Sequence, residues 1–369
     1  MKIAIDARLL QGKFTGDRTY WRGLIRGLSR LDSEDEYVLY TYPSMSDIES
    51  SDACELAQRP VPAMSWRSWS LWAFPRALRR DGVDLAHVQY SIPLFASCPV
   101  VTSVHDISFK TCPQYFGFKD RFLLDRGFRY GVKHAVRILA LSEHTKPDII
   151  DYYHVNPQKI EVVYPGVDEE FQLLDKAACK TVALEKYAID KPFVITVGVV
   201  PARKNIPRLI RAFAASRKAI ASEHKLLIVG KPGAEEENLR DLAQNLGVAD
   251  DVIIAGHVPQ EDLPSLYNAA QLCVYPSLYE GFGLPAVEAM ACGVPVITGN
   301  RSSLPEAVGD AGITVDPVDC DALAEAISSV LSSESRRTEM SAKGLEQASK
   351  FSWDDTARRV AELYREAVR

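Results

Sequence analysis

Short apolar runs rich in β-branched residues alternate with longer amphipathic stretches along the whole chain. In the first half the runs are followed or separated by helix-like stretches such as Tyr20–Leu31 and Arg121–His134. This alternation is typical of βαβ units that build a parallel sheet. The predicted strands are Ile3–Asp6, Tyr37–Tyr42, Asp84–Val88, Val100–His105 and Arg137–Leu141, then Phe193–Val199, Lys225–Val229, Val252–Ala255, Leu272–Tyr275, Val294–Ile297 and Ile313–Val315. The pattern predicts an α/β protein with two doubly wound sheets.

The break between the two sheets is predicted near residue 168. Tyr164–Asp168 holds turn-forming residues, and the stretch from there to Lys191 is polar. Residues 1–167 carry 21 basic and 19 acidic residues, whereas the rest carries 22 and 30. A chain of 369 residues also exceeds what one hydrophobic core normally serves. We predict an N-terminal domain over 1–167, a linker over 168–190, a C-terminal domain over 191–351 and a final helix over about 352–369.

Composition excludes several classes of function. No apolar stretch approaches the roughly 20 residues that span a bilayer, and charged residues near Met1 argue against an export signal. Seven scattered cysteines without Cys-x-x-Cys spacing favour a reducing cytoplasm over a disulfide framework or a zinc site. A net charge of −6 disfavours nucleic-acid binding. Glycine motifs of dehydrogenases and of nucleoside-triphosphatases are missing from the expected positions. We expect a cytoplasmic protein whose membrane contact, if any, is peripheral.

A glycine-bearing loop after the strand Leu272–Tyr275 carries the strongest chemical signal. The loop leads into a helix that Pro285 is well suited to begin. Loop N–H groups and the positive helix end together form an anion site that would suit a diphosphate. Glu280 lies in the loop and Glu288 about one turn into the helix, where carboxylates can accept hydrogen bonds from vicinal hydroxyls. The alternative is a surface glutamate followed by a helix-stabilising one.

Two adjacent cations follow the strand Phe193–Val199. Arg203 and Lys204 stand at the start of a predicted helix. There they would add countercharge for a diphosphate leaving group as a glycosidic bond breaks. Taken alone, such a pair is more often a solvated surface feature.

The spacing of Glu280 and Glu288 resembles the Glu-x7-Glu signature of glycosyltransferase family 4, and the flanking residues resemble that family as well. The resemblance implies the GT-B fold, in which two Rossmann-like domains face across a cleft and the last helix crosses back to the first domain. It also implies metal-independent transfer of a hexose with retention of configuration. The implied donor contacts are Glu288 to the ribose, Glu280 to the sugar, and the amides of Gly281, Phe282, Gly283 and Leu284 to sugar and diphosphate.

Further positions acquire a role through the same resemblance. Arg203 and Lys204 match the family's phosphate-binding element, although Val199 stands where many members have an arginine. His105 matches a histidine that points at the donor sugar, and Asp106 would order the loop beyond it. Gly16 matches the first glycine of the loop after the first strand, but Arg18 replaces the second glycine. Val258 and Lys231 would line the nucleotide base.

Two other features have competing interpretations. Asp319 and Asp321 form an Asp-x-Asp, which binds metal in other glycosyltransferases, but they begin a predicted helix where acidic caps are common. Trp66, Trp69 and Trp72 have the spacing of one helical stripe, which is more often core than membrane-facing. We favour the cap and the core, and we expect no metal and no cofactor.

The sequence predicts a retaining hexosyltransferase. Its first-choice donor is GDP-mannose, with glucose or another hexose on UDP, GDP or ADP as the next choice. The nucleotide-sugar is a substrate, and the acceptor is a glycan, a lipid-linked saccharide or a small molecule. The alternative is a non-catalytic GT-B protein that binds a nucleotide or a glycan as a scaffold, and the sequence does not predict an oligomeric state.

Overall fold

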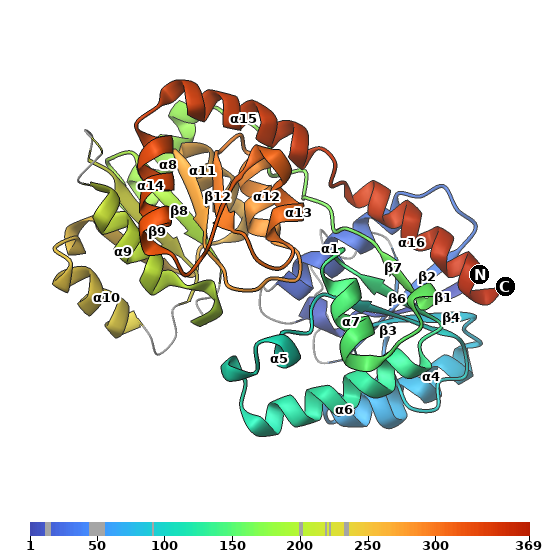
Figure 1. Cartoon of the computed structure of the whole chain (residues 1–369). Helices are drawn as coiled ribbons and strands as arrows, with labels where there is room; N and C mark the ends of the chain where they lie inside the picture. Colours follow the sequence, from blue (N-terminus) through green and yellow to red (C-terminus); the bar gives the residue numbers. More distant parts are fainter. Residues whose placement is uncertain are drawn as a thin grey trace. The chain divides into compact units, whose positions relative to one another are not determined.

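Two parallel sheets organise the chain, as the alternating pattern predicts (Figure 1). The computed structural model describes residues 1–11, 16–43, 56–90, 92–198, 202–217, 220, 223–231 and 236–369. These residues divide into unit 1, which is Met1–Gly166 with Phe351–Arg369, and unit 2, which is Val167–Lys350. Each unit contains one of the sheets and its own helices.

The seven-stranded sheet of unit 1 has the order β3-β2-β1-β4-β5-β6-β7, and every neighbouring pair is parallel. Its central strands are buried because helices lie on both faces of such a sheet. The edge strands β3 and β7 are short and were not predicted. The strands are β1 (Lys2–Asp6), β2 (Glu36–Thr41), β3 (Ala57–Pro60), β4 (Leu85–Gln89), β5 (Val100–Val104), β6 (Arg137–Ala140) and β7 (Ile160–Val162).

The helices of unit 1 include the last helix of the chain, α16, which packs against α1. Small residues make this contact close: a Cβ on Gly23 would lie 1.9 Å from the Trp353 ring, and one on Gly27 2.6 Å from the Trp353 carbonyl. The predicted return of the final helix to the first domain is therefore confirmed. The helices are α1 (Gly16–Ser29), α3 (Trp66–Ser68), α4 (Phe74–Asp81), α5 (Ser108–Thr111), α6 (Phe118–His134), α7 (Thr145–Tyr153) and α16 (Trp353–Val368).

Unit 2 contains a six-stranded sheet in the order β10-β9-β8-β11-β12-β13, again parallel throughout. Its strands are β8 (Phe193–Val197), β9 (Lys225–Val229), β10 (Val252–Gly256), β11 (Leu272–Tyr275), β12 (Val296–Gly299) and β13 (Ile313–Val315). Its helices are α8 (Lys176–Tyr187), α9 (Ile206–Ser216), α10 (Glu236–Asn245), α11 (Leu263–Ala269), α12 (Leu284–Ala291), α13 (Leu304–Val308), α14 (Cys320–Leu331) and α15 (Glu334–Ala348).

The stretch 168–190, which we expected to be a linker, is part of unit 2. Asp175 caps the start of α8 by accepting the N–H of Ala178, and α8 then packs against α11. The buried residues of α8 are Cys179 and Ala183. Because much of the rest of the helix is polar, its sequence resembles that of a linker.

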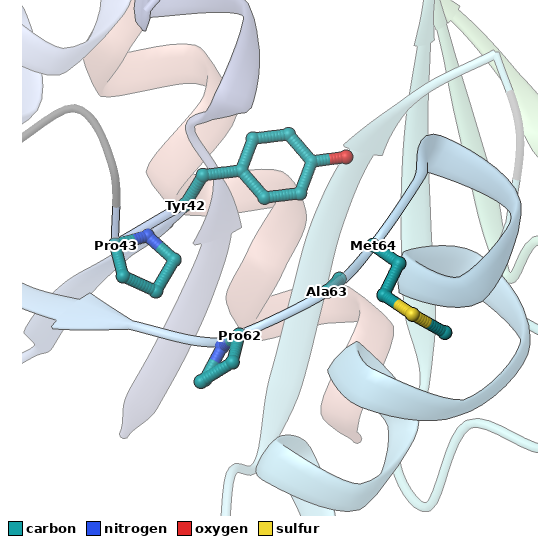
Figure 2. A pocket seen from close by; sticks show the side chains of 5 residues that line it. All are labelled: Tyr42, Pro43, Pro62, Ala63 and Met64. Carbon is teal, nitrogen blue, oxygen red and sulfur yellow. The ribbon is translucent and has the colours of Figure 1, made fainter.

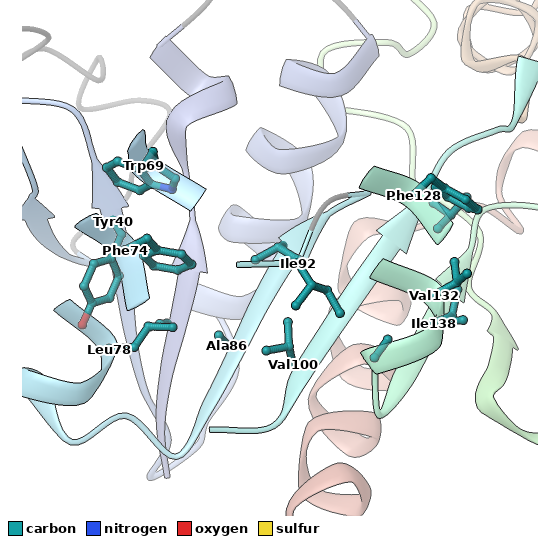
Figure 3. Packing of buried hydrophobic residues seen from close by; sticks show 14 of the residues in the cluster. Tyr40, Trp69, Phe74, Leu78, Ala86, Ile92, Val100, Phe128, Val132 and Ile138 are labelled. Carbon is teal, nitrogen blue, oxygen red and sulfur yellow. The ribbon is translucent and has the colours of Figure 1, made fainter. Parts of the chain in front are cut away.

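The three tryptophans expected to share one stripe do not share an environment. Trp69 is fully buried and stacks on Phe74, with ring centroids 5.4 Å apart, in the core cluster of Figure 3. Trp66 and Trp72 remain 57% and 65% exposed. A π-helical turn over Trp69–Ala73 joins α3 to α4 and changes the angular spacing of the side chains, so the prediction of a single stripe is wrong.

Candidate functional site

The order of the strands in unit 2 places the ends of β8 and β11 next to each other. From β8 the chain proceeds outward through β9 to β10, and it then returns to build β11, β12 and β13 on the other side. Ligands of open parallel sheets bind beside the carboxyl ends of the strands at such a reversal. The loop with Arg203 and Lys204 follows β8, and the loop with Glu280 follows β11, so both predicted motifs lie at the reversal.

The loop after β11 turns into α12 at Gly283. Gly283 has φ +109° and precedes the helix, while Pro285 occupies its first turn, as predicted. A Cβ at Gly283 would meet the Leu304 side chain at 2.7 Å, so no other residue fits without strain. The first N–H groups of α12 cannot bond within the helix and carry its positive end. The N–H groups of Leu284 and of the preceding loop can therefore donate hydrogen bonds to an anion.

Glu280 is held by both cations of the neighbouring loop. Arg203 Nη1 lies 3.1 Å from Glu280 Oε2, and Lys204 Nζ lies 2.7 Å from Glu280 Oε1. Arg203 also donates to the Tyr279 carbonyl at 2.9 Å, and Lys204 contacts the Tyr275 hydroxyl and lies over its ring. The cations are therefore ordered groups of this cluster, and the interpretation as a solvated surface pair is wrong.

The neighbouring Arg203 and Lys204 keep the Glu280 carboxyl ionised. Its side chain is 8% exposed. Burial raises the pKa of the Glu280 carboxyl, but the positive charges of Lys204 and Arg203 outweigh burial and lower that pKa from 4.5 to about 2. The Glu280 carboxyl is therefore ionised at neutral pH, and it lies between two basic side chains.

The backbone of both loops is fixed by side-chain hydrogen bonds. Ser302 Oγ accepts the Glu280 N–H at 2.9 Å, and Ser303 Oγ donates to the carbonyls of Glu280 and Phe282, each at 2.9 Å. Asn205 adopts a left-handed conformation and donates to the Pro276 carbonyl at 3.2 Å. Ser302 and Ser303 were not predicted, and Asn205 belongs to the predicted turn with Arg203 and Lys204 but was given no role of its own. The available signal was that these polar side chains follow the ends of strands: Ser302 and Ser303 follow β12, and Asn205 follows β8.

Glu288 lies on α12, one turn after the helix begins, and it is 8% exposed. Tyr267 of α11 donates its hydroxyl to Glu288 Oε2 at 3.4 Å. Burial raises the pKa of Tyr267 well above its usual value, and the Glu288 charge raises it further. Tyr267 therefore remains a neutral donor to this carboxylate.

The remaining predicted donor residues of unit 2 lie along the same edge of its sheet. Val258 follows β10 and is 5% exposed, whereas Lys231 follows β9 and is exposed. The Gly230 N–H donates to the Gly256 carbonyl at 2.7 Å and joins the two strand ends. Val199, the predicted departure from the family pattern, lies outside the described residues.

In unit 1 the predicted residues follow β1 and β5. His105 comes directly after β5, and its Nδ1 lies 2.9 Å from Oδ1 of Asp17, which was not predicted. Gly16 is the first residue of α1, and no atom of the described residues lies within 4 Å of the place where a Cβ would stand. Asp106 accepts the Ser108 N–H at 2.8 Å and orders the loop, as expected.

Two other parts of the molecule bear on the site assignment. Asp319 accepts the N–H groups of Asp321 and Ala322 and caps α14, which confirms the helix-cap interpretation. A shallow hollow of unit 1 is lined by Tyr42, Pro43, Pro62, Ala63 and Met64 (Figure 2). None of the predicted donor-binding residues lines it.

Comparison with known proteins matches both halves of the chain to sequence families. The family described as "Glycosyl transferases group 1" matches residues 182–347, and "Glycosyltransferase Family 4" matches residues 15–171. The chain is 36% identical over 267 residues to the O-antigen chain mannosyltransferase B of Escherichia coli, covering 72% of this chain and 70% of that protein. It is 31% identical over 249 residues to the serotype-specific mannosyltransferase WbdA of Escherichia coli, but this match covers only 31% of WbdA.

Solved structures share the fold. Sucrose-phosphate synthase from Thermosynechococcus elongatus superposes with a TM-score of 0.80 at 22% identity, covering 99% of this chain and 98% of that one. Anabaena HepE, solved in complex with UDP and glucose, superposes with a TM-score of 0.79 at 18% identity, covering 99% and 100%. At these identities the likeness concerns the fold alone.

Proposed function

Because this chain belongs to the group 1 glycosyltransferases of family 4, we propose that it transfers mannose from GDP-mannose to a saccharide acceptor with retention of configuration. It is a hexosyltransferase of the GT-B fold. The choice of mannose is supported by its similarity to two mannosyltransferases of Escherichia coli. Glucose on a UDP, GDP or ADP carrier is the next choice.

One observation carries the proposal: Glu280 is buried between Arg203 and Lys204 at the reversal of the sheet, beside the start of α12. A protein that needed only a stable core would gain little from this arrangement, since buried ion pairs rarely stabilise a fold more than apolar residues do. A site for a diphosphate sugar needs all three parts. The amides and cations bind phosphate oxygens, and the carboxylate binds sugar hydroxyls.

The roles of the residues follow from this geometry. Arg203 and Lys204 stabilise the negative charge that develops on the departing diphosphate, with the amides of Gly281, Phe282, Gly283 and Leu284 as further donors. Glu280 binds hydroxyls of the sugar, and Glu288 those of the ribose. In unit 1, Gly16 lets the backbone approach the diphosphate and His105 binds a sugar hydroxyl. The base lies against Val258 and Lys231.

The reaction needs no metal, because the two cations and the positive end of α12 supply the countercharge that a metal provides elsewhere. The acceptor hydroxyl attacks the anomeric carbon on the face from which the diphosphate leaves. The bond from that carbon to the phosphate oxygen breaks, and the departing oxygen takes the proton of the acceptor hydroxyl. Activity is expected to be unchanged by EDTA.

A donor panel tests the proposal. Purified protein is incubated with GDP-mannose, UDP-glucose, GDP-glucose or ADP-glucose, with and without a mannose-containing oligosaccharide, and release of nucleotide is measured. We expect release from GDP-mannose, stimulated by the oligosaccharide. Binding of a nucleotide-sugar without any release would instead support the non-catalytic scaffold.

Matched variants locate the activity in the predicted cluster. Lys204→Met should lower kcat by about 10²-fold or more, as expected for loss of a group that stabilises charge in the transition state. Lys343→Met replaces an exposed lysine of α15 and should leave kcat unchanged. Equal activity of the two variants would exclude the assigned role of Lys204.

We also propose that the protein acts in the cytoplasm and touches the inner face of the membrane, where a lipid-linked acceptor would be found. Among the described residues no helix is long and apolar enough to cross a bilayer. Met64, Trp66 and Trp72 are 97%, 57% and 65% exposed. Phe95 is 74% exposed, and the preceding Leu94 N–H donates to the Ser70 carbonyl of the same segment. The exposed cations of this segment, which suit an anionic surface, are Arg67, Arg76, Arg79 and Arg80.

Co-sedimentation with vesicles tests this contact. The double variant Trp66→Ser with Trp72→Ser should bind vesicles containing phosphatidylglycerol about tenfold less than the wild type. The control Phe118→Ser with Phe122→Ser removes exposed aromatics of α6 and should bind like the wild type. Equal loss in both variants, or in neither, would refute this choice of surface.

A further inference from the structure

A chain of side-chain hydrogen bonds in unit 1 begins at the buried indole of Trp21. Trp21 Nε1 lies 2.7 Å from Gln89 Oε1. An indole N–H can only donate, so the end of the Gln89 amide that faces it must be the oxygen. The other end of the amide, Nε2, is therefore a donor. The hydrogen bond from the indole therefore fixes the orientation of the Gln89 amide.

The donor end of Gln89 points to Asp17. Gln89 Nε2 lies 2.7 Å from Asp17 Oδ1, and the same oxygen lies 2.9 Å from Nδ1 of His105. Burial raises the pKa of the Asp17 carboxyl, but the hydrogen bonds that it accepts from His105 and Gln89 lower that pKa below its usual value. Asp17 also lies in the first turn of α1, where the helix dipole favours negative charge. Asp17 is therefore an ionised carboxylate, which can accept hydrogen bonds but cannot donate them.

The order of donors and acceptors along this chain of hydrogen bonds determines which ring nitrogen of His105 carries a proton. Because Asp17 only accepts, Nδ1 of His105 must carry a proton. In the neutral ring Nε2 then has a lone pair. Nε2 is buried and receives no hydrogen bond from the residues that the structure describes. The imidazole ring contacts the rings of Tyr20 and Tyr90, whose centroids are 4.6 Å and 5.8 Å away.

We propose that Trp21, Gln89 and Asp17 form a relay that fixes the tautomer and the orientation of His105, so that Nε2 accepts a hydrogen bond from a sugar hydroxyl. Asp17 is the positioning residue of this relay. The identity of the bound hydroxyl rests on the proposed transferase function, whereas the tautomer does not.

The strand order of unit 1 explains why these residues meet. In its sheet, β1 and β4 are neighbours at the reversal of the chain, and β5 lies next to β4. Asp17 follows β1, Gln89 ends β4, and His105 follows β5. The relay therefore occupies the position in unit 1 that the Glu280 cluster occupies in unit 2.

Nitrogen NMR of the ligand-free protein tests the relay directly. Long-range 1H–15N spectra distinguish the protonated from the unprotonated nitrogen of each histidine, and His105→Gln assigns the signal. We expect wild-type His105 to carry its proton on Nδ1 when neutral. In Asp17→Asn the share of this tautomer should fall, and in Asp17→Glu, which keeps the carboxylate, it should be largely restored. A proton on Nε2 in the wild type would overturn the proposal.

Kinetics test the consequence of the relay. Asp17→Asn should lower kcat about tenfold or more, the loss expected when a hydrogen bond to a charged group is removed. The Kd for GDP should stay within about twofold, because the ribose, base and cation contacts are assigned to unit 2 and the substitution leaves the backbone of Gly16, the diphosphate contact of unit 1, in place. The control Asp120→Asn makes the same change in the first turn of α6 and should leave kcat unchanged. Equal kcat in Asp17→Asn and the wild type would overturn the role of Asp17.

The two arms separate failure of this inference from failure of the proposed function. If no donor is turned over by the wild type, the proposed function fails, and the NMR result still decides whether the relay exists. If the wild type is active and Asp17→Asn changes neither tautomer nor kcat, only the relay is refuted.

Discussion

Glutamine in place of Glu280 is expected to destabilise unit 2 because it leaves two cations without their buried partner. Glutamine has nearly the same shape as glutamate, so the change removes charge and little packing. Arg203 and Lys204 lower the pKa of the Glu280 carboxyl from 4.5 to about 2. Each pKa unit corresponds to about 1.4 kcal/mol, which gives a loss of roughly 3 kcal/mol in the free energy of unfolding. Breaking a buried ion pair has a cost of this size in other proteins.

The loss should depend on pH in a defined direction. The folded-state pKa of Glu280 lies below its unfolded value, so the carboxylate contributes its full stability above about pH 4.5. That contribution declines as pH falls from 4.5 toward 2, because wild-type Glu280 then becomes protonated as well. The difference between wild type and Glu280→Gln should therefore be constant near neutral pH and shrink at acid pH. Other groups that titrate in this range are present in both proteins and cancel.

Urea unfolding at pH 7, 5, 4 and 3 measures this difference. The matched control is Glu339→Gln, which removes an exposed carboxylate paired with Lys343 on α15. Exposed pairs contribute under about 1 kcal/mol, so this variant should unfold almost like the wild type. A Glu280→Gln difference that stays the same from pH 7 to pH 3 would refute the electrostatic reasoning and leave packing as its cause.

Three further substitutions have expected outcomes of their own. Gly283→Ala should cost about 1–3 kcal/mol in urea unfolding and weaken GDP binding in calorimetry, because φ is +109° and the new Cβ would meet Leu304. The Tyr364 hydroxyl lies 2.6 Å from Nδ1 of the buried His87. Tyr364→Phe leaves that nitrogen without a partner and should lower the free energy of unfolding in urea by about 1–3 kcal/mol. Asp319→Ala should lower the free energy of unfolding by about 0.5–2 kcal/mol through loss of the α14 cap, with no change in GDP binding.

Much of the fold could be predicted because its central strands are continuous apolar runs. Buried parallel strands such as β5 and β11 differ sharply in composition from the helices around them. The edge strand β3 is exposed along its whole length, and β7 has three residues, so neither carries this signal. The tryptophan stripe failed for a related reason. A helical pattern assumes a constant rise and turn, and the π-helical turn at Trp69–Ala73 breaks that assumption.

The chemistry of the site could be predicted only within single loops. Glu280 and Glu288 are close in sequence, so their spacing alone identifies a loop followed by a helix. Asp17 and His105 are far apart in sequence, and no local pattern relates them. Their contact depends on which strands are neighbours in the sheet, and that order is set by crossovers that the alternating pattern does not reveal.

The two reversals of strand order therefore explain more of the site than any motif. In each unit the loops after two non-consecutive strands become neighbours, β1 with β4 and β8 with β11. In each unit, too, a carboxylate near that place is fixed by basic groups that follow a different strand: Asp17 by His105, and Glu280 by Arg203 and Lys204. These contacts hold each carboxylate in one position before any ligand arrives. Such preorganisation lowers the cost of ordering the site when a substrate binds.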